Sequence, residues 1–231
     1  MSITEQTTIT DIAREVPSSV RVFQQHGIDF CCGGKRTLGA VCQEQGLSFT
    51  DIAAEIRTSA VQPDTRERDW SREPLTALTG HIVKTYHQPL RQELPQLESM
   101  AAKLARVHGA KAPHLQQVNA LLGELSADLQ AHMQKEELVL FPAIETLERA
   151  GRAAIGISAP IAVMEHEHDH AGDLLAELRK VTGGYEVPAW GCDTFRALYR
   201  GLAELEAAMH VHVHLENNLL FPRALEMTST R

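Results

Sequence analysis

Two histidine–glutamate pairs recur at identical spacing in the second half of the chain. His132 stands four residues before Glu136, His212 stands four residues before Glu216, and the triplet Leu-Phe-Pro follows each pair at the same offset. Residues four apart on an α-helix are separated by one turn and about 40° of rotation, so the imidazole and the carboxylate of a pair can reach one point. The spacing therefore indicates two sets of metal ligands.

Each pair also has a single histidine upstream at almost the same distance. His87 lies 45 residues before His132, and His168 lies 44 residues before His212. The repeat indicates one helical hairpin used twice, with a histidine on its first helix and the histidine–glutamate pair on its second. Two such hairpins, facing each other across a near two-fold axis, would bring four histidines and two carboxylates into one core.

Four long helical patterns can position these groups. Apolar residues step by three and four from Pro74 to about His108, from about Pro113 to Leu147, from near Pro160, and again after Pro188. Alternation with period two is almost absent, which argues against strands. We therefore predict an all-α protein with an up-down four-helix bundle over residues 74–231.

A small helical domain is expected before the bundle, over residues 1–60. Ser18-Ser19, Thr37 and Ser48 to Thr50 are typical helix starts, and Gly27 and Gly46 are typical helix ends. A domain of this size has little core of its own, so we expect it to lean on the rest of the chain or on a partner. Residues 61–73 are charged, lack apolar periodicity and are expected to form a linker.

All six ligand candidates take positions where the helical pattern demands a buried apolar residue. A buried charged glutamate is costly unless it is paired or bound to a metal. Short loops make the helices alternate in direction, so the six groups can share a depth of roughly 12–20 Å from one end of the bundle. His108 lies about 30 Å from His87 along the same helix and cannot join them.

Four further histidines flank the candidates and are expected to point elsewhere. Residues two apart on a helix point to roughly opposite sides, so these four should be solvated or lie at interfaces. The sequence gives no account of their role. They are His166, His170, His210 and His214.

Six nitrogen and oxygen ligands exceed what one tetrahedral zinc needs, and two carboxylates can bridge two cations. Each cation would take two histidines and a share of both glutamates. An oxo or hydroxo bridge would make it five-coordinate and leave one position open. Imidazole and carboxylate without thiolate suit iron, with manganese and zinc as alternatives. The opposing interpretation is a plain bundle whose core histidines are satisfied without a metal.

A cysteine pair, Cys31-Cys32, lies in the small domain and is followed by Gly33-Gly34, Lys35 and Arg36. The glycines let the backbone approach a neighbour closely, and the two cations would lower a thiol pKa. The pair could bind metal, exchange disulfides, relay iron or contact a partner. Small residues at a tight turn are the alternative interpretation.

Composition excludes several classes of protein. The chain has 231 residues and a net charge of −8, so no nucleic-acid footprint is expected. It has no run of eighteen apolar residues and its start lacks an export signal, so we expect a cytoplasmic protein without a membrane span. Its four cysteines should then be free thiols, with Cys42 and Cys192 as ordinary ones.

In combination, these motifs resemble those of the iron-sulfur cluster repair di-iron proteins, also called the RIC or ScdA/YtfE-type family. The likeness covers nearly the whole chain, with a short Cys-Cys-Gly-Gly module before a hemerythrin-like bundle. Hemerythrins proper hold their irons with five histidines and two carboxylates, and the four histidines here favour the repair family. The motifs are Asp29-Phe30-Cys31-Cys32-Gly33-Gly34, Tyr86-His87, His132-Met133-Gln134-Lys135-Glu136-Glu137, Met164-Glu165-His166-Glu167-His168-Asp169, and Leu215-Glu216-Asn217-Asn218 before Leu220-Phe221-Pro222-Arg223.

The resemblance implies a cytoplasmic non-haem protein with two iron ions that restores clusters damaged by nitric oxide or oxidants, as an iron donor to damaged iron-sulfur proteins. Cys31 and Cys32 match the family's N-terminal pair, as possible redox or iron-relay thiols. The implied ligands are the six residues that periodicity selects: His87, His132, Glu136, His168, His212 and Glu216.

Several functions use the same ligands and stay open at this point. The centre could donate iron, bind nitric oxide or dioxygen as a scavenger or sensor, or couple two nitric oxide molecules to nitrous oxide, which would make the protein an enzyme. A metal-free scaffold is the remaining alternative. An exposed Cys31-Cys32 pair would also be compatible with a homodimer.

Overall fold

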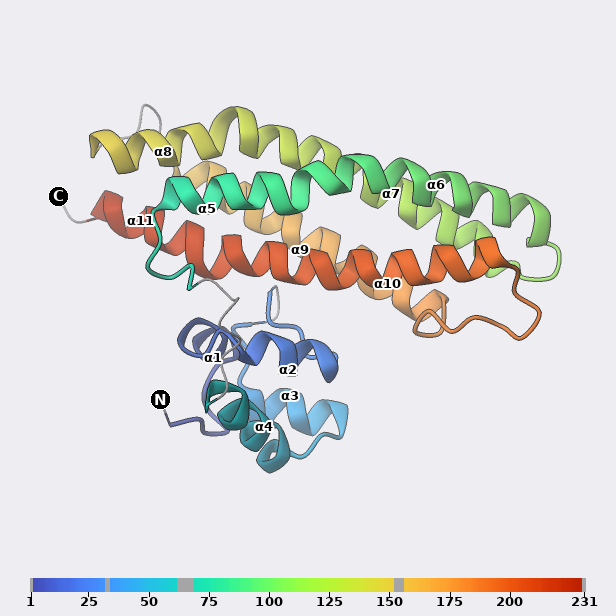
Figure 1. The fold of residues 1–231 in the computed structure, drawn as a ribbon, viewed down its shortest axis with the longest axis horizontal. Helices are drawn as coiled ribbons and strands as arrows, with labels where there is room; N and C mark the ends of the chain where they lie inside the picture. Colours follow the sequence, from blue (N-terminus) through green and yellow to red (C-terminus); the bar gives the residue numbers. More distant parts are fainter. Residues whose placement is uncertain (1, 32–33, 62–68, 152–155, 230–231) are drawn as a thin grey trace.

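Helices account for the regular structure of the described chain (Figure 1). A computed structural model describes residues 2–31, 34–61, 69–151 and 156–229. Within these ranges the only β pairing is an isolated antiparallel bridge between Thr8 and Thr37. The expected all-α class is confirmed.

Four short helices form the N-terminal module. They are α1 (Ile9–Glu15), α2 (Ser19–Gln25), α3 (Leu38–Gln45) and α4 (Phe49–Val61). The starts of α2, α3 and α4 lie where the sequence predicts them, whereas α1 is a helix that the sequence analysis missed.

Capping explains two of these helix starts. Thr8 and Thr37 accept hydrogen bonds from the backbone N–H groups of Asp11 and Ala40, at 3.2 and 3.3 Å. Gly46 then ends α3 with a φ of 69°, a left-handed conformation that glycine adopts without strain. The residues expected as a linker, 61–73, fall partly outside the described ranges, so that boundary stays a prediction.

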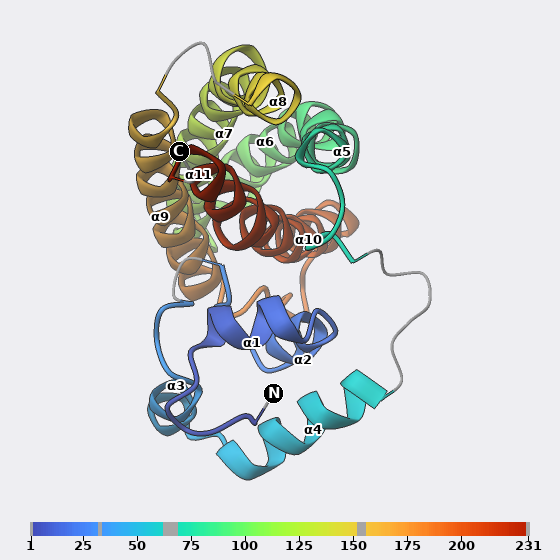
Figure 2. The same cartoon turned by 90° about the vertical axis from the view of Figure 1, so that its left-hand side faces the viewer.

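Four antiparallel rods form the bundle, and Figure 2 shows them nearly end-on. The third rod is one uninterrupted α-helix. Each of the other three consists of an α-helix, a short π-helical segment (η) and a second α-helix. The elements are α5 (Leu75–Ile82), η1 (Val83–His87) and α6 (Gln88–His108); α7 (His114–Lys135), η2 (Glu136–Leu140) and α8 (Phe141–Ala150); α9 (Ser158–Val181); and α10 (Asp193–His214), η3 (Leu215–Leu220) and α11 (Phe221–Ser229).

A proline follows each π-helical segment two residues after its last residue. Pro89, Pro142 and Pro222 take this place after η1, η2 and η3. Proline has no backbone N–H and its ring crowds the carbonyl four residues back, so it disfavours an ordinary α-turn before it, although Pro95 is accommodated inside α6 without a π-helical segment. A π-turn accommodates this, and such turns recur at functional sites.

The bundle interior consists of two hydrophobic clusters separated along its axis. One cluster includes Leu90, Leu129, Ala171 and Met209, and the other includes Ile82, Leu140, Met164 and Leu220. All six ligand candidates fall between these flanking residues in the sequence of their rods. They therefore form one polar layer between two apolar ones.

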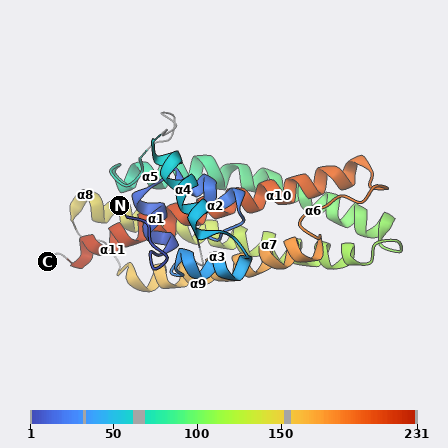
Figure 3. The same cartoon turned by 90° about the horizontal axis from the view of Figure 1, so that it is seen from below.

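The N-terminal module packs against the bundle face made by α9 and α10 (Figure 3). The Phe30 ring meets His210 and His214 edge-on, with ring centroids 6.0 and 5.6 Å apart. The amide nitrogen of Gln24, Nε2, donates to the Ala207 carbonyl at 3.1 Å. The module thus covers the bundle near the polar layer, as its small core leads us to expect.

None of the described helices combines the length and the apolar composition needed to cross a membrane.

The bundle's first helix is capped by a residue from another rod. Glu148, on α8, accepts hydrogen bonds from the backbone N–H groups of Leu75 and Thr76 at 2.6 and 2.9 Å. Burial would raise the pKa of Glu148, but the hydrogen bonds from Thr76 and Leu75 outweigh it and lower the pKa. The ionised carboxylate therefore satisfies two N–H groups of α5 that have no partner inside that helix.

We expect Glu148→Ala to lower the free energy of unfolding by about 1–2 kcal/mol at pH 7, because the start of α5 loses its cap. The folded pKa of Glu148 is depressed, so its contribution is complete above the unfolded pKa of about 4.3 and disappears as the pH falls through the folded pKa. Urea unfolding of the metal-free protein at pH 7 and below pH 4 measures both effects. Glu93→Ala, on the exposed face of α6, is the control; an equal loss at both pH values would contradict the assignment.

Candidate metal centre

The six ligand candidates converge in the polar layer of the bundle. Their exposed fractions are 0–3%, so charge on any of them must be compensated inside the protein. His87, Glu136 and Glu216 lie in the π-helical segments η1, η2 and η3, which the prolines position. We call these six residues, His87, His132, Glu136, His168, His212 and Glu216, the six-residue cluster.

One half of the cluster is built around His87 and His212. Their Nε2 atoms are 3.1 Å apart. Glu136 Oε2 lies 3.4 Å from His87 Nε2, and Glu216 Oε1 lies 3.0 Å from His212 Nε2. One ligand atom from each of these four residues falls within 4.8 Å of all the others, which is the spacing that a single metal ion needs.

The other half is built in the same way around His132 and His168. Their Nε2 atoms are 3.0 Å apart, Glu136 Oε2 lies 3.3 Å from His132 Nε2, and Glu216 Oε2 lies 3.2 Å from His168 Nε2. The four ligand atoms again lie within 4.8 Å of one another. Glu136 and Glu216 belong to both halves, so each carboxylate is placed to bridge two positions.

Three of the four histidines have their outer nitrogen, Nδ1, engaged by a neighbour. Nδ1 of His87 lies 2.7 Å from Glu137, which also binds Arg91. Nδ1 of His132 lies 2.9 Å from Glu167, which also binds Lys135. In the third case Nδ1 of His168 lies 2.8 Å from Asn217 Oδ1. The buried Nδ1 of His212 makes no hydrogen bond within the described residues.

These outer contacts fix where the protons are. Burial would raise the pKa of Glu137 and of Glu167, but the hydrogen bonds from their basic partners outweigh it and lower both values. An ionised carboxylate only accepts, so Nδ1 of His87 and of His132 carries the proton and donates it outward. In a neutral imidazole Nε2 is then a lone pair that faces the interior.

The interior therefore presents several acceptors to one another with few protons to share. Glu136 has neither carboxylate oxygen in a hydrogen bond within the described residues, and Oε2 of Glu216 has none either. Facing lone pairs and buried carboxylates repel unless cations lie between them. The donor set fits divalent metals that accept imidazole and carboxylate ligands.

In the metal-free protein a proton provides part of this compensation. Burial lowers the pKa of His132, but the carboxylates of Glu136 and Glu216, with the hydrogen bond to Glu167, outweigh burial and raise the pKa to about 9. For His87, burial and the nearby His212 prevail and lower the pKa. A protonated His132 thus supplies positive charge that a metal would otherwise supply.

The acidic partner in this balance is Glu216. Burial would raise its pKa, but the contacts with His212 and His168 hold it well below its usual range. The carboxylate therefore stays ionised in the core and is available to a cation.

Two hollows lead towards the cluster from opposite sides. A cleft of about 380 Å³ between α7 and α9 is lined by His132 and His168, together with Lys135 and Glu167. A larger cavity of about 660 Å³ lies between the N-terminal module and the bundle and is lined by Tyr86 among others. The Tyr86 ring stacks on His212, with centroids 5.1 Å apart and planes within 3°.

The flanking histidines divide as expected into exposed and interfacial residues. His166 and His170 are exposed on α9, where His170 Nε2 lies 3.5 Å from Glu124 and 3.4 Å from Asp128. His210 and His214 pack against Phe30 of the N-terminal module. None of the four contributes to the six-residue cluster.

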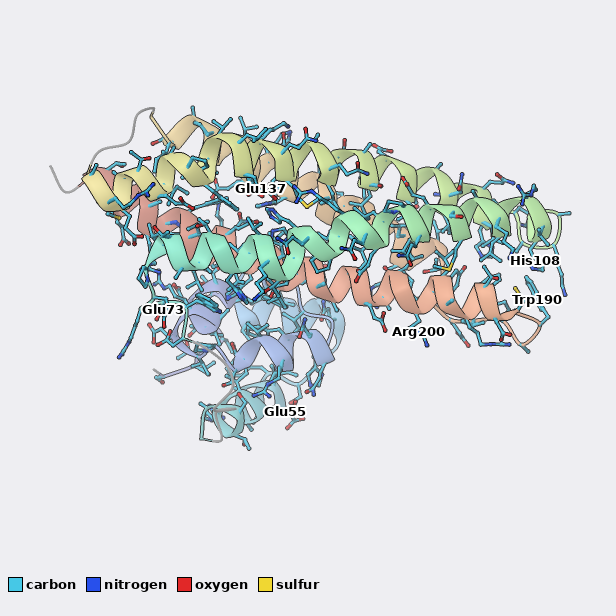
Figure 4. All side chains as sticks on the ribbon, turned by 45° about the horizontal axis from the view of Figure 1, so that its top comes forward. Glu55, Glu73, His108, Glu137, Trp190 and Arg200 are labelled. Atoms are coloured by element: carbon cyan, nitrogen blue, oxygen red, sulfur yellow. The ribbon has the colours of Figure 1, made fainter. Side chains whose placement is uncertain are left out.

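His108 is remote from the cluster, as its sequence position predicts. Figure 4 shows His108 and Trp190 at the opposite end of the bundle from Glu137. His108 Nε2 lies 3.6 Å from the sulfur of Cys192. Cys42 is buried in the N-terminal core and Cys192 is partly exposed.

The loop that carries Cys31 lies against the bundle core. Cys31 is only 6% exposed, and its backbone N–H and its thiol both donate to Asp29 Oδ1, at 2.9 and 3.2 Å. Arg36 pairs with Glu44 and not with the thiol. Cys32 and Gly33 lie outside the described residues.

Close packing explains the second glycine of the loop. The Gly34 carbonyl accepts from the Thr10 backbone N–H at 2.8 Å. A Cβ on Gly34 would lie 2.3 Å from the Thr10 hydroxyl, so a larger residue would push the loop away from α1. The expected close approach of the backbone at this glycine is thus observed.

Sequence reasoning selected the six residues but missed their outer partners. Glu137 and Glu167 stood within the quoted motifs without a role, although each lies one residue from a candidate. The position of Glu137 could have identified it, because it directly follows the candidate ligand Glu136. Its side chain contacts His87 on the first rod. Asn217 gave no signal of its own beyond its place after Glu216.

Comparison with known proteins covers both parts of the chain. Residues 79–224 match the family described as Hemerythrin HHE cation binding domain, and residues 5–60 match the Domain of Unknown function (DUF542). The chain is 41% identical over 219 residues to the iron-sulfur cluster repair protein YtfE of Pectobacterium atrosepticum, covering 93% of this chain and 95% of that protein.

Two further relatives carry the same name. The protein from Edwardsiella ictaluri is 42% identical over 215 residues, covering 93% of this chain and 95% of its own. The protein from Yersinia pseudotuberculosis is 41% identical over 214 residues, covering 93% and 94%.

We expect Glu167→Ala to weaken metal binding by about 10–100-fold, because His132 loses the acceptor that holds its outer proton and its ring orientation. Glu167→Gln should retain part of the affinity, since an amide oxygen can still accept that proton. Competition between the protein and a chelator for ferrous ion measures the effect. Glu165→Ala removes the same charge from the exposed side of α9 and is the control; equal affinities for the two alanine variants would contradict the role of Glu167.

Proposed function

Because the chain belongs to the iron-sulfur cluster repair family with a hemerythrin-type cation-binding domain, we propose that it restores damaged iron-sulfur clusters by supplying iron. The iron comes from a centre of two ions held by the six-residue cluster. This extends to the chain what the names of its relatives state.

The observation that carries the proposal is the pair of overlapping four-residue groups. His87 and His212 are the histidine ligands of one ion, His132 and His168 are those of the other, and the two glutamates are shared. A duplicated set with common carboxylates supports two ions at adjacent positions better than a single ion. All residues of the two groups are buried, so the proposal does not depend on exposed acidic residues, which often cluster without a metal ion.

The ligand types suit an ion that must be retained and then released. Imidazole and carboxylate hold ferrous ion without the thiolates that bind soft metals most firmly. Bound iron would supply redox and Lewis-acid chemistry to this site. The protein's own contribution is to hold the histidine protons outward and to keep water and large molecules from the buried layer.

The two positions differ in their access to solvent. His132 and His168 line the cleft between α7 and α9, whereas His87 and His212 do not. Lys135 and Glu167 stand at this cleft as an ion pair. The ion held by His132 and His168 is therefore the one placed to leave towards a recipient protein.

Recipients are iron-sulfur proteins whose clusters have lost iron to nitric oxide or oxidants. The reaction belongs in the cytoplasm, where thiols such as Cys42 and Cys192 remain reduced. Cys31 and Cys32 are the thiols that would contact the recipient or relay iron. Nitric oxide and dioxygen are the small molecules that the open positions of the centre would admit.

The central test is repair of an inactivated cluster enzyme by the diferrous protein. We expect the enzyme to regain activity faster and to a greater extent than with an equal amount of free ferrous ion, and the donor to lose iron in step. Reversible binding of nitric oxide or dioxygen without loss of iron would favour a scavenger or sensor. Many turnovers of nitric oxide with a defined electron donor would favour an enzyme.

The shared carboxylates give a prediction for metal content. Glu136→Ala should lower retention of both ions, because each four-residue group loses a ligand. His87→Ala should lower retention of one ion and leave His132 and His168 able to hold the other. Iron analysis after gel filtration, together with optical spectra, distinguishes the two patterns. If Glu136→Ala keeps two irons per chain with unchanged spectra, the bridging role is wrong.

A further inference from the structure

One histidine of the cluster is held by a residue that also touches the N-terminal module. Nδ1 of His87 and of His132 meets a carboxylate of the bundle, whereas Nδ1 of His168 lies 2.8 Å from Oδ1 of Asn217. Asn217 directly follows Glu216 on η3. The neutral amide of Asn217 accepts from His168 as the ionised carboxylates of Glu137 and Glu167 accept from His87 and His132. An amide has one oxygen and one nitrogen, so a further contact must fix which of them faces His168.

The fixing contact comes from the loop that carries Cys31. Asn217 Nδ2 donates to the Cys31 carbonyl at 3.5 Å. The next residue, Asn218, donates from Nδ2 to the Phe30 carbonyl at 3.0 Å and is buried. Two consecutive amides of η3 therefore hold two consecutive carbonyls of the loop.

These contacts determine which end of the amide faces the cluster. A carbonyl can only accept, so the Cys31 carbonyl holds the amide nitrogen of Asn217 and leaves Oδ1 towards His168. Oδ1 also only accepts, so Nδ1 of His168 donates to it and Nε2 faces the other histidine as a lone pair. The position of the loop thus reaches the metal-facing nitrogen of His168 through the Asn217 side chain.

Cys31 cannot be reached without disturbing this arrangement. Its side chain packs within the hydrophobic cluster of the bundle and its thiol donates to Asp29. Attack on the thiol, or its capture by another protein, requires the loop to move away from the bundle. That movement removes the carbonyl that orients Asn217.

We propose that Asn217 is a positioning residue that couples the docking of the Cys31 loop to retention of the ion held by His132 and His168. The inference rests on the proposed function and adds its regulation: a partner that engages the Cys31 loop loosens the ion beside the open cleft. Among the described residues, no side chain links the ring of His87 or of His212 to a carbonyl of this loop, so the ion between them stays.

The coupling is reciprocal by thermodynamic necessity. If a docked loop strengthens metal binding, bound metal must hold the loop down by the same factor. Metal should therefore protect the Cys31 thiol even though the thiol is not a ligand of the cluster. This gives a readout that does not depend on repair activity.

The first experiment follows iron release from the full-length diferrous protein to a chromogenic chelator. We expect Asn217→Ala to accelerate release of one of the two irons by about 10-fold or more, and to leave the second nearly unchanged. Asn217→Asp should rescue retention, because it restores an acceptor for His168 of the kind that Glu137 and Glu167 provide.

The matched control is Gln24→Ala. It also removes an amide that binds a carbonyl across the same interface, that of Ala207, but it touches no residue of the cluster. Iron release from this variant should match that of the wild type. Circular dichroism of the metal-free proteins checks folding, and Asn217→Ser replaces Asn217→Ala if the latter does not fold.

The second experiment measures alkylation of Cys31, by mass spectrometry, in a Cys32→Ser background with and without ferrous ion. Metal should slow alkylation about 5-fold or more in the parent protein and in Gln24→Ala. It should have no effect in Asn217→Ala or in Asn217→Asp, since both variants lack the donor to the Cys31 carbonyl. Cys192, at the far end of the bundle, is the internal reference.

The outcomes separate the two levels of inference. Full retention of two irons with wild-type release in Asn217→Ala, or alkylation of Cys31 that ignores metal in the parent protein, would overturn the coupling and leave the proposed function standing. A parent protein that retains no iron, or that fails to repair a cluster enzyme while showing metal-dependent protection of Cys31, would count against the proposed function instead.

Discussion

The structure depends on a conflict among buried acceptors that the protein alone does not resolve. The partners of His87, His132 and His168 hold the Nδ1 protons of these rings outward, and His132, whose pKa is raised, binds a second proton. The inner nitrogens then face one another at 3.0–3.1 Å, beside two glutamates without exposed surface. Apolar layers on both sides keep water away. Positive charge in this layer offsets the conflict: the proton on His132 supplies part of it in the metal-free protein, and bound cations would supply more.

Short π-helical segments interrupt three of the four rods at the level of the cluster. Straight α-helices with histidine and glutamate four apart would bring each pair close to one point, but they would not fix how the pairs from different rods meet. The π-helical segments contain His87, Glu136 and Glu216, and each ends two residues before a proline. Proline suits the irregular turn, because a regular turn would lack a donor and crowd a carbonyl, but it does not dictate one, since Pro95 lies within the regular helix α6. The ligand directions follow from the π-helical turns.

Sequence alone was sufficient for the all-α class, for the family and for the set of residues that converge. Periodicity and duplication report on one helix at a time, and the six residues lie on the buried face of their helices. The same signals are blind to contacts between elements. They did not show that Glu167 supports His132 or that Asn217 supports His168, because those partners come from other rods. They also missed α1, a seven-residue helix whose start is marked only by the Thr8 cap. The prolines were visible, but without the structure nothing linked them to π-helical turns.

The sequence repeat explains the two matching groups of ligand candidates inside the bundle. It does not predict the surroundings of the histidines that flank them. The two triplets of alternating histidines look alike in sequence, yet His166 and His170 are exposed whereas His214 is buried beneath Phe30. Burial lowers the pKa of His214 to about 4, so its uncharged ring can pack against an aromatic one while Nδ1 accepts from Asn218 at 2.8 Å. The side-chain contacts described above for the N-terminal module fall on the second repeat, on α10 and on the residues next to Glu216. The two halves of the cluster thus differ in their surroundings. The half with His132 and His168 lies beside the cleft and is linked to the Cys31 loop. The half with His87 and His212 is enclosed by bundle residues, and His212 stacks against Tyr86. The module contributes to this asymmetry through its contact with Asn217, whereas the cleft is lined by residues of α7 and α9.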